Sequence, residues 1–376
     1  MSHHDLIELT YGPVTPILSK ALRSMFVAGR GRRLYGADFS NIEGRLNAWF
    51  AGEVWKLEAF RDYDNGTGPE LYRLAYAKSF GIHPDQVDGG KSKGPQRKIG
   101  KTEELALGYQ GSCGAWLRFD PQPTLVTKVM TEQFYGTKAW EKAAVQHDRA
   151  RYHMGLDPNS WISIKIVVNS WREANSRIVQ SWWAVQDAAL EAVQAPGSVV
   201  SVLDGKVQYL VDDGFLWCRL PSGKLLAYAQ PRLVEMKEEF LVDGEGEVFP
   251  IEEFLPDELE AKIAAGAKIE TGRTRTQVCF NGKSKTGHWG RQYLYGGLQC
   301  NNYTQATARE LLRFALHNLE DAGYPTVLHV HDEAVSEVDE SYGSVEEYRK
   351  IMTLLPPWLT DFPLAAQAWT HHRYVK

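Results

Sequence analysis

The sequence predicts an α+β protein, because helical and β patterns occupy separate stretches of the chain. Apolar residues recur at helical spacing over most of residues 40–194, but alternate with polar residues between Asp-Gly and Ser-Gly turns over 198–233. A second alternating run, over 326–338, predicts a β-hairpin. Such segregation is typical of antiparallel sheets beside a mostly helical region.

The first elements follow from local capping and periodicity. We expect a short helix over 14–30, a strand over 34–38, and then a helix for which Ser40 is the N-cap. The apolar stripe of this last helix consists of Ile42, Leu46, Trp49 and Phe50.

The middle of the chain is predicted to be helical. A helix over 70–80 ends at Gly81, and an exposed connection rich in Gly and Lys follows over 87–95. The next helix is expected over about 96–110, and further helices continue to residue 194.

Strands dominate the next part. Four antiparallel strands joined by tight turns are expected between residues 198 and 233. Residues 235–285 are acidic and then basic, and are predicted to form a surface insertion. A helix over 304–322 then precedes the hairpin over 326–338.

Composition places the chain among ordinary globular proteins. Its 376 residues, 43% hydrophobic and 24% charged, can bury a large core. No apolar run is long enough to span a membrane and no signal or transit peptide stands at the N-terminus, so we expect a cytoplasmic protein without a membrane partner. Four cysteines lie far apart without a Cys-x-x-Cys pair, which argues against a zinc site or a disulfide framework.

The net charge of −5 does not exclude a nucleic-acid partner, because charge is segregated along the chain. Acidic residues gather in 235–247 and 252–260. Two basic clusters consist of Lys20, Arg23, Arg30, Arg32 and Arg33, and of Lys91, Lys93, Arg97, Lys98 and Lys101.

Carboxylates stand where two predicted strands end. Asp38 ends a strand just before a helix, and His331 and Asp332 would lie at the tip of the hairpin. Adjacent carboxylates such as Asp332 and Glu333 are rare in apolar strands without a cation to reduce their repulsion. Taken singly, the turn after Asp38 could hold a capping box for its own helix, and the hairpin could be a plain polar turn.

A basic strip is expected on one side of the helix over 96–110. Its members recur every fourth residue and therefore share one face; they are Arg97, Lys101, Leu105 and Tyr109. The two cations suit the phosphates of a nucleoside triphosphate, and the other two side chains suit its sugar and base. The strip could also be a solvated face that runs into the core.

The same segment contains a second motif, which we reject. Residues 94–102 (GPQRKIGKT) resemble a Walker A phosphate loop. The spacing has one residue too many, no buried strand is predicted before it, and Pro95 lacks a backbone donor. Pro95 instead suits the first turn of a helix.

In combination, the acidic and basic segments resemble motifs A, B and C of the family A, or DNA polymerase I-like, polymerases. Motif A of the family, Asp-x-Ser-x-Ile-Glu-x-Arg, is matched by Asp38, Ser40, Ile42, Glu43 and Arg45. Motif B, Arg-x3-Lys-x7-Tyr-Gly, is matched by Arg97, Lys101 and Tyr109. Motif C, His-Asp-Glu, is matched by His331, Asp332 and Glu333. The amino-acid sequence of residues 104–111 (ELALGYQG) is similar to that of the bacteriophage and prophage branch of the family.

Three positions depart from the family pattern. Gly44 stands where motif A usually has Leu, Gln110 replaces the Gly after the motif B tyrosine, and Leu105 stands where the family has Phe or Tyr. The family also carries an Asn and a Gln that face the minor groove on a helix ahead of motif C. Gln305 matches this Gln, and Asn301, beside Asn302, matches the Asn.

The resemblance implies a template-directed DNA polymerase that adds dNTPs to a primer 3′ end. Asp38 and Asp332 would hold two Mg²⁺ ions, for which Mn²⁺ could substitute, and Glu333 would lie close to them. The implied dNTP-binding residues are Arg97, Lys101, Leu105, Tyr109 and Glu43, and Lys101 is also implied to protonate the leaving pyrophosphate. The implied DNA-binding residues are His331, Gln305, Asn301 and Arg45.

Glu43 carries the implied choice of sugar. In the family this Glu packs against the motif B tyrosine and blocks a ribose 2′-OH, whereas related single-subunit RNA polymerases have a small residue there. We therefore favour DNA synthesis over two alternatives. These are a single-subunit RNA polymerase or primase-like enzyme, and a catalytically weak or inactive replication accessory protein that binds DNA.

The resemblance also implies a right-hand architecture. Palm segments are expected at 1–60 and 291–376, helical fingers at 61–197, and a β-rich region at 198–290. The thumb, the first palm segment and a 3′–5′ exonuclease domain are not expected within this chain, since a usual domain would not fit ahead of motif A. Either a separate polypeptide supplies them, or the chain is a fragment or a reduced relative of such a polymerase. Primer-template DNA and dNTPs are the other expected partners, in the host cytoplasm if the protein is phage-encoded.

Overall fold

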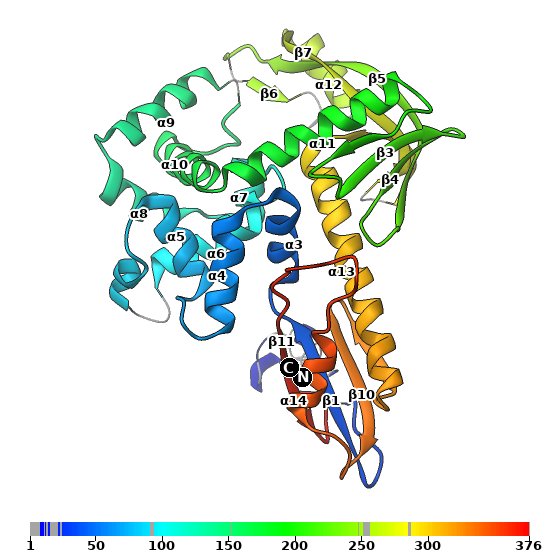
Figure 1. Cartoon of the computed structure of the whole chain (residues 1–376). Helices are drawn as coiled ribbons and strands as arrows, with labels where there is room; N and C mark the ends of the chain where they lie inside the picture. The colour runs from blue at the N-terminus through cyan, green and yellow to red at the C-terminus, as the bar shows by residue number, and fades with distance from the viewer. Residues whose placement is uncertain are drawn as a thin grey trace. The chain divides into compact units, whose positions relative to one another are not determined.

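The computed structural model of the chain describes residues 8–10, 12, 14–15, 22, 25–90, 94–150, 152–246, 248–250, 256–284 and 287–375. It divides into two compact units (Figure 1). Unit 1 comprises Met1–Leu46 and Thr304–Lys376, and unit 2 comprises Asn47–Tyr303. Helices α3 (Ile42–Ala51) and α13 (Gly296–Asp321) each cross this division in the sequence.

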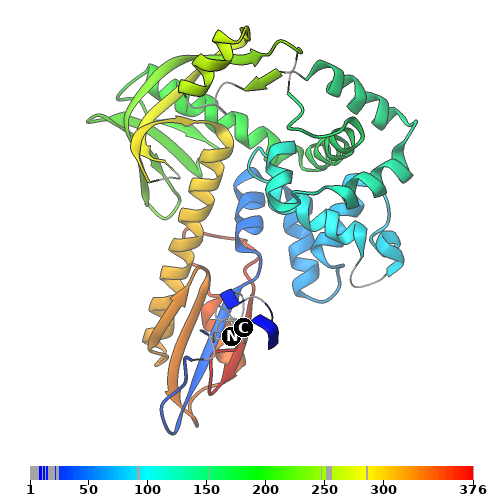
Figure 2. The same ribbon diagram turned by 180° about the vertical axis from the view of Figure 1, so that it is seen from behind.

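Unit 1 is built on a four-stranded antiparallel sheet in the order β11-β1-β10-β9. Its strands are β1 (Arg32–Phe39), β9 (Thr326–Val330), β10 (Glu333–Asp339) and β11 (Ala366–His371). Helix α14 (Val345–Met352) packs against β1 and β11, as the two opposite views show (Figure 1, Figure 2). The sheet therefore joins both ends of the described chain in one layer.

Each face of this sheet has its own core. On one face, Tyr35 stacks on Tyr348 of α14 with ring centroids 5.7 Å apart. On the other face, Gly36 lies directly opposite Trp369. A Cβ atom on Gly36 would lie 2.2 Å from the indole, so only glycine lets Trp369 lie flat across β1.

The helical part of unit 2 surrounds one buried helix. Helix α10 (Pro158–Ala174) begins with Asp157 as N-cap, whose side chain accepts a hydrogen bond from the Ser160 backbone N–H at 3.1 Å. Both Trp161 and Trp171 of this helix are buried. The neighbouring helices are α4 (Val54–Asp64), α5 (Leu71–Phe80), α6 (Pro95–Leu107), α7 (Cys113–Phe119), α8 (Thr124–Phe134), α9 (Lys138–Arg149) and α11 (Ser176–Gln194), with a 3₁₀ segment η1 (Pro84–Gly90).

The β part of unit 2 is one antiparallel sheet in the order β2-β3-β4-β5-β7-β8, with β6 paired to β5. Helix α11 packs against its strands β2, β3, β5 and β7. The elements are β2 (Val200–Val202), β3 (Val207–Asp212), β4 (Phe215–Arg219), β5 (Leu225–Val242), β6 (Val248–Pro250), α12 (Pro256–Ala264), β7 (Lys268–Lys283) and β8 (Trp289–Leu294). Much of the predicted insertion over 235–285 thus extends the sheet, because β5 and β7 pair along most of their length.

The α+β class, with antiparallel sheets and a mostly helical region, is confirmed. The hairpin is β9–β10, and α5 ends at Gly81 in the left-handed conformation, as predicted. The predicted domain bounds are a functional division and stay a prediction. Among the described residues, no helix combines the length and apolar character that a membrane crossing requires.

Three local predictions differ from the structure. A helix was predicted over 14–30, but residues 25–30 are not helical, and Val27 forms a β-bridge with Arg373. Helix α3 begins at Ile42, one residue later than Ser40 as N-cap predicts, and the Asn41 carbonyl accepts its first backbone hydrogen bond. Helix α6 ends at Leu107 instead of residue 110.

The two basic clusters are only partly described. Lys20, Arg23, Lys91 and Lys93 lie outside the described residues. Of the remaining cations, Arg32 pairs with Glu337 at 3.7 Å. The four cysteines are free and buried.

Candidate active site

The two residues predicted to bind metal, Asp38 and Asp332, come together in the backbone pairing at one end of β1 and β10. Asp38 lies opposite Glu333 in the register, and the Phe39 backbone N–H donates a hydrogen bond to the Asp332 carbonyl at 3.3 Å. His331 and Asp332 form the turn between β9 and β10, and His331 has a φ of 55°. Antiparallel pairing thus brings together Asp38 and Asp332, which are far apart in the sequence.

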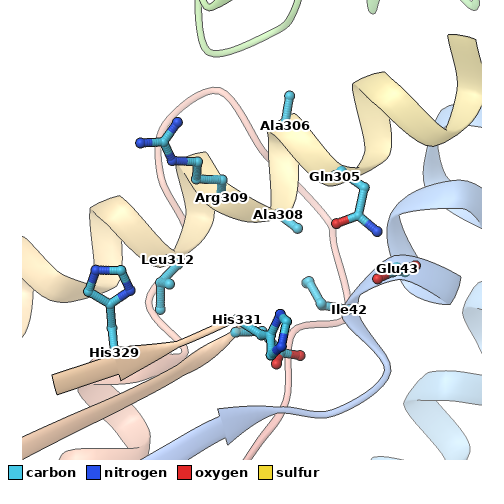
Figure 3. Close-up of a pocket in the computed structure, with 10 residues that line it drawn as sticks. Ile42, Glu43, Gln305, Ala306, Ala308, Arg309, Leu312, His329 and His331 are labelled. Atoms are coloured by element: carbon cyan, nitrogen blue, oxygen red, sulfur yellow. The ribbon is translucent and has the colours of Figure 1, made fainter. Parts of the chain in front are cut away.

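A cleft of about 640 Å³ opens beside this turn, within unit 1 (Figure 3). Three elements contribute polar side chains to it: the hairpin tip, the start of α3, and the middle of α13. Figure 3 shows Gln305 pointing from α13 toward Glu43, which lies at the start of α3. The lining residues are Ile42, Glu43, Gln305, Ala306, Ala308, Arg309, Leu312, His329, His331 and Asp332.

The donor atoms suit a hard divalent cation. Asp38 and Asp332 supply carboxylate oxygens, the ligands that Mg²⁺ prefers. Among the described residues, no group of three or more His, Cys, Asp or Glu side chains is arranged to hold a metal. A carboxylate pair of this kind fits Mg²⁺, which usually keeps several waters and completes its shell with substrate phosphates.

Glu333 occupies a different environment from Asp332. Its side chain is buried and accepts hydrogen bonds from Trp369 Nε1, at 3.3 Å, and from the Tyr374 hydroxyl. It lies on the same sheet face as Asp38 but does not line the cleft. These contacts are those of a residue that orders the strand ends, and its predicted catalytic role stays a prediction.

Arg45, for which the resemblance implies a DNA contact, is fully buried. Its contact with DNA stays a prediction. Its Nε donates to the Ser40 carbonyl at 2.6 Å, and one terminal nitrogen donates to the Pro363 carbonyl at 2.9 Å. Because Arg45 points into unit 1 from the inner side of α3, it ties the turn after Asp38 to the segment before β11.

Gln305 and Asn301 lie one helical turn apart on α13, as predicted. Gln305 is exposed and lines the cleft, while Asn301 is half-buried. Asn302 donates a hydrogen bond to the Tyr228 hydroxyl at 3.1 Å, so its side chain already has a partner within unit 2. Asn301 therefore stays the better match for the predicted minor-groove residue.

The basic strip on α6 is present over two helical turns. Arg97 and Lys101 both lie over the ring of Tyr72, at 5.4 and 5.9 Å from its centroid, and Arg97 also pairs with Glu70 at 2.8 Å. Burial, followed by the charge of Glu70, raises the pKa of Tyr72, so the phenol is neutral beneath the cations. Tyr72 belongs to none of the sequence motifs, so the sequence did not predict that it lies at the basic strip.

The end of the strip differs from the prediction. Leu105 is exposed on α6, but Tyr109 lies in the turn after the helix and so does not continue the strip at helical spacing. At the other end, Pro95 occupies the first turn as expected. The Asp88 carboxylate, from η1, accepts hydrogen bonds from the backbone N–H groups of Gln96 and Arg97 at 3.0 and 2.9 Å. It thus provides the capping that Gly94 lacks.

The inner side of α6 carries two acidic residues in contrasting states. Glu104 is ion-paired with Lys56, Nζ to Oε2, at 2.7 Å. Glu103 is fully buried, with a Ser79 hydroxyl 3.3 Å from one oxygen. Burial, and then the charge of Glu104, raises the pKa of Glu103 well above its usual value, so the carboxyl keeps its proton where a solvated one would lose it.

Glu103→Gln is therefore expected to remove a pH dependence of stability. The folded chain holds a proton on Glu103 that the unfolded chain releases above pH 4.5, so wild-type stability falls as the pH rises from there toward the raised pKa. Glutamine is neutral at every pH and avoids this loss. Urea unfolding from pH 4 to 8 should show the variant gaining on the wild type as pH rises. Exposed Glu141→Gln is the control, and parallel curves for wild type and Glu103→Gln would contradict the assignment.

Comparison with known proteins finds sequence similarity to proteins named DNA polymerase. No family model matches the sequence. The chain is 32% identical over 374 residues to a protein named DNA polymerase from Bacillus phage SP02, covering 100% of this chain and 46% of that protein. Over 78 residues it is 33% identical to DNA polymerase I of Mycobacterium tuberculosis, covering 20% of this chain and 8% of that protein. The chain thus spans about half the length of the phage relative.

A solved structure is also similar. It is described as the POL domain of Pol1 from M. smegmatis in complex with DNA primer-template and dNTP, and the alignment covers 96% of this chain and 43% of that one. The identity is 15% and the TM-score 0.48. The sequence relationships confirm the resemblance to DNA polymerases.

Proposed function

We propose that this chain, which is similar over its whole length to a phage DNA polymerase, forms the palm and fingers of a family A DNA polymerase. It would add dNTPs to a primer 3′ end under the direction of a template. The observation that carries the proposal is the meeting of Asp38 and Asp332 beside a cleft that Glu43, His331 and Gln305 also line.

In this proposal Asp38 and Asp332 hold the catalytic Mg²⁺ ions, or Mn²⁺ in their place. Bound at these carboxylates, two such ions would lower the pKa of the primer hydroxyl and offset charge on the departing pyrophosphate. His331, exposed at the hairpin tip, would contact the primer terminus, and Gln305 with Asn301 would contact the minor groove of the product duplex. Buried Glu333 would hold the β1 and β10 ends in register.

The outer face of α6 is proposed to bind the triphosphate. Arg97 and Lys101 are a pair of cations one helical turn apart, which suits two phosphate groups of one nucleotide. The Arg97–Glu70 ion pair would exchange for a pair between Arg97 and phosphate when the nucleotide binds. Lys101 would donate the proton that the leaving pyrophosphate takes up. Leu105 would lie against the nucleotide's sugar, and Tyr109, from the turn after α6, against its base.

Glu43→Ala is expected to relax the choice of sugar. Glu43 is exposed at the start of α3 and lines the cleft, where its carboxylate would occupy the space of a ribose 2′-hydroxyl. Removing it should raise ribonucleotide over deoxynucleotide incorporation by about 10- to 100-fold, the discrimination that one pocket contact supplies. Single-nucleotide primer extension with paired dNTPs and rNTPs measures the ratio. Exposed Glu58→Ala on α4 is the matched control, and an unchanged ratio in Glu43→Ala would remove Glu43 from the sugar site.

Primer extension by the purified chain tests the proposal as a whole. Extension with dNTPs in Mg²⁺ is the expected result. Extension with rNTPs alone would point to an RNA polymerase or primase-like enzyme. DNA binding without any extension, in Mg²⁺ or Mn²⁺, would point to a replication accessory protein.

The proposal also includes a partner polypeptide, a cellular location and a division of the chain into functional parts. A separate polypeptide with a thumb or a 3′–5′ exonuclease is proposed to hold the primer-template, in the cytoplasm of a phage host. The palm at 1–60 and 291–376, the fingers at 61–197 and the β-rich region at 198–290 are the proposed functional parts. Co-purification from the native source tests whether such a partner accompanies the chain.

A further inference from the structure

Strand β8 of unit 2 presents a row of exposed aromatic and basic side chains. Trp289, Arg291 and Tyr293 alternate along the strand and therefore project from one face of the sheet. Trp289 is 70% exposed and Tyr293 is 43% exposed, and Arg291 is exposed between them. Large aromatic groups are costly to leave in water, so this row indicates a binding surface.

The strands beside β8 add positive charge to the same face. Lys283 of β7 lies opposite Trp289, and Arg232 of β5 lies opposite Cys279, which in turn lies opposite Tyr293. Arg291 extends across β7, with a terminal nitrogen 3.1 Å from Cys279 Sγ. We call Arg232, Lys283, Trp289, Arg291 and Tyr293 the β8 face.

Among the described residues, no carboxylate lies opposite β8 on this face. The residues of β7 opposite Trp289, Arg291 and Tyr293 are Lys283, Asn281 and Cys279. Within the part of the chain that the structure describes, no ion pair is recorded for any of the three cations of the β8 face. The chain as a whole has a net charge of −5, so this is a local concentration of positive charge. Its ligand should be an anion.

The aromatic groups narrow the class of anion. Trp289 and Tyr293 stand two pleats apart, about 13 Å along the strand, with the Arg291 guanidinium between them. Flat, open aromatic faces between cations suit a chain that alternates bases with phosphates. A duplex offers phosphates but hides the faces of its bases in the stack, so it would leave the indole without a partner. A single strand satisfies both kinds of group.

We propose that the β8 face binds single-stranded nucleic acid, with bases stacked on Trp289 and Tyr293 and phosphates held by Arg232, Lys283 and Arg291. This surface shares no residue with the cleft beside Asp332. The inference does not depend on the proposed polymerase activity, because it rests on the chemistry of one sheet face.

Fluorescence anisotropy with labelled dT20 tests the proposal on the full chain. Trp289→Ala and Tyr293→Ala should each weaken binding by about 5- to 100-fold, the effect of losing one base–aromatic stack. Trp289→Phe should keep most of the affinity, since it keeps an aromatic face. Arg291→Ala should also reduce the slope of log affinity against log salt by about 0.7, the loss of one phosphate contact to a single strand.

Two controls are built into the chain. Trp183 on α11 is a half-exposed tryptophan outside the β8 face, and Lys142 on α9 is an exposed cation, so Trp183→Ala and Lys142→Ala should leave dT20 binding unchanged. Circular dichroism and thermal melting establish that every variant is folded. Unchanged dT20 affinity in folded Trp289→Ala and Tyr293→Ala would overturn the proposal. An equal loss for dT20 and for a blunt duplex would also overturn it, because base stacking would then not be involved.

Discussion

Asp332→Asn is expected to slow nucleotide addition by about 1000-fold, corresponding to roughly 4 kcal/mol of lost transition-state stabilisation. Asparagine keeps the shape of the side chain at the hairpin tip but removes the negative charge that would hold a divalent cation. Primer-template binding should change little, because the substitution leaves the cleft and its basic and amide side chains in place. Single-turnover primer extension, with DNA affinity measured in parallel, separates the two effects.

A matched control lies on β10, the strand that follows the turn. Asp339 at the far end of β10 is exposed and remote from the turn, so Asp339→Asn should extend primers at the wild-type rate. Asp38→Asn should resemble Asp332→Asn, and the double variant should be little slower than either, since the two carboxylates act as one unit. Near-normal extension by Asp332→Asn would exclude the carboxylate pair as the catalytic centre.

Lys56→Met is expected to lower the free energy of unfolding by about 3–5 kcal/mol, the cost of breaking a buried ion pair from one side. Lys56 Nζ donates to Glu104 at 2.8 Å and to Asn175 Oδ1 at 3.0 Å, and Trp171 Nε1 also donates to Glu104, at 2.9 Å. Methionine fills the space of the lysine stem but leaves the Glu104 carboxylate buried without its cation. Urea unfolding at pH 7 measures the loss.

A second variant isolates the charge. Glu104→Gln in the Lys56→Met background should recover a large part of the stability, because a neutral amide still accepts from Trp171 and no buried charge remains. The exposed pair Lys142–Glu173 provides the contrast, and Lys142→Met should cost at most about 1 kcal/mol. Equal losses in the Lys56 and Lys142 variants would show that burial of the pair does not matter.

The positions of the candidate active-site residues in the fold were predictable because their signals are local. Asp38 follows an apolar strand and precedes an amphipathic helix, and His331 and Asp332 interrupt an alternating apolar run, so each was placed at the end of a strand from neighbouring residues alone. The start of α6 at Pro95 was predictable for the same reason. The N-terminal cap of α6 was less predictable, because it is the carboxylate of Asp88, which comes from a preceding segment.

Side chains that interact across the fold were not predictable. Arg45 matches a DNA-binding motif position, but its environment is set by the Pro363 carbonyl, far along the chain. Glu333 has the same sequence signal as Asp332, yet Trp369 and Tyr374 bury it. Tyr72 lies beneath Arg97 and Lys101 only because α5 packs against α6.

The amino-acid sequence by itself determined the α+β class, the hairpin tip, the basic strip at the start of α6 and the resemblance to DNA polymerases. Each of these depends on periodicity, turn residues or motif spacing over a few residues. Tertiary structure decided which carboxylates meet, which of the motif residues are buried, and that β5, β7 and β8 bring Arg232, Lys283 and Trp289 onto one face. The physical reason is that strand pairing and burial join residues distant in the sequence, and local propensity does not specify these partners.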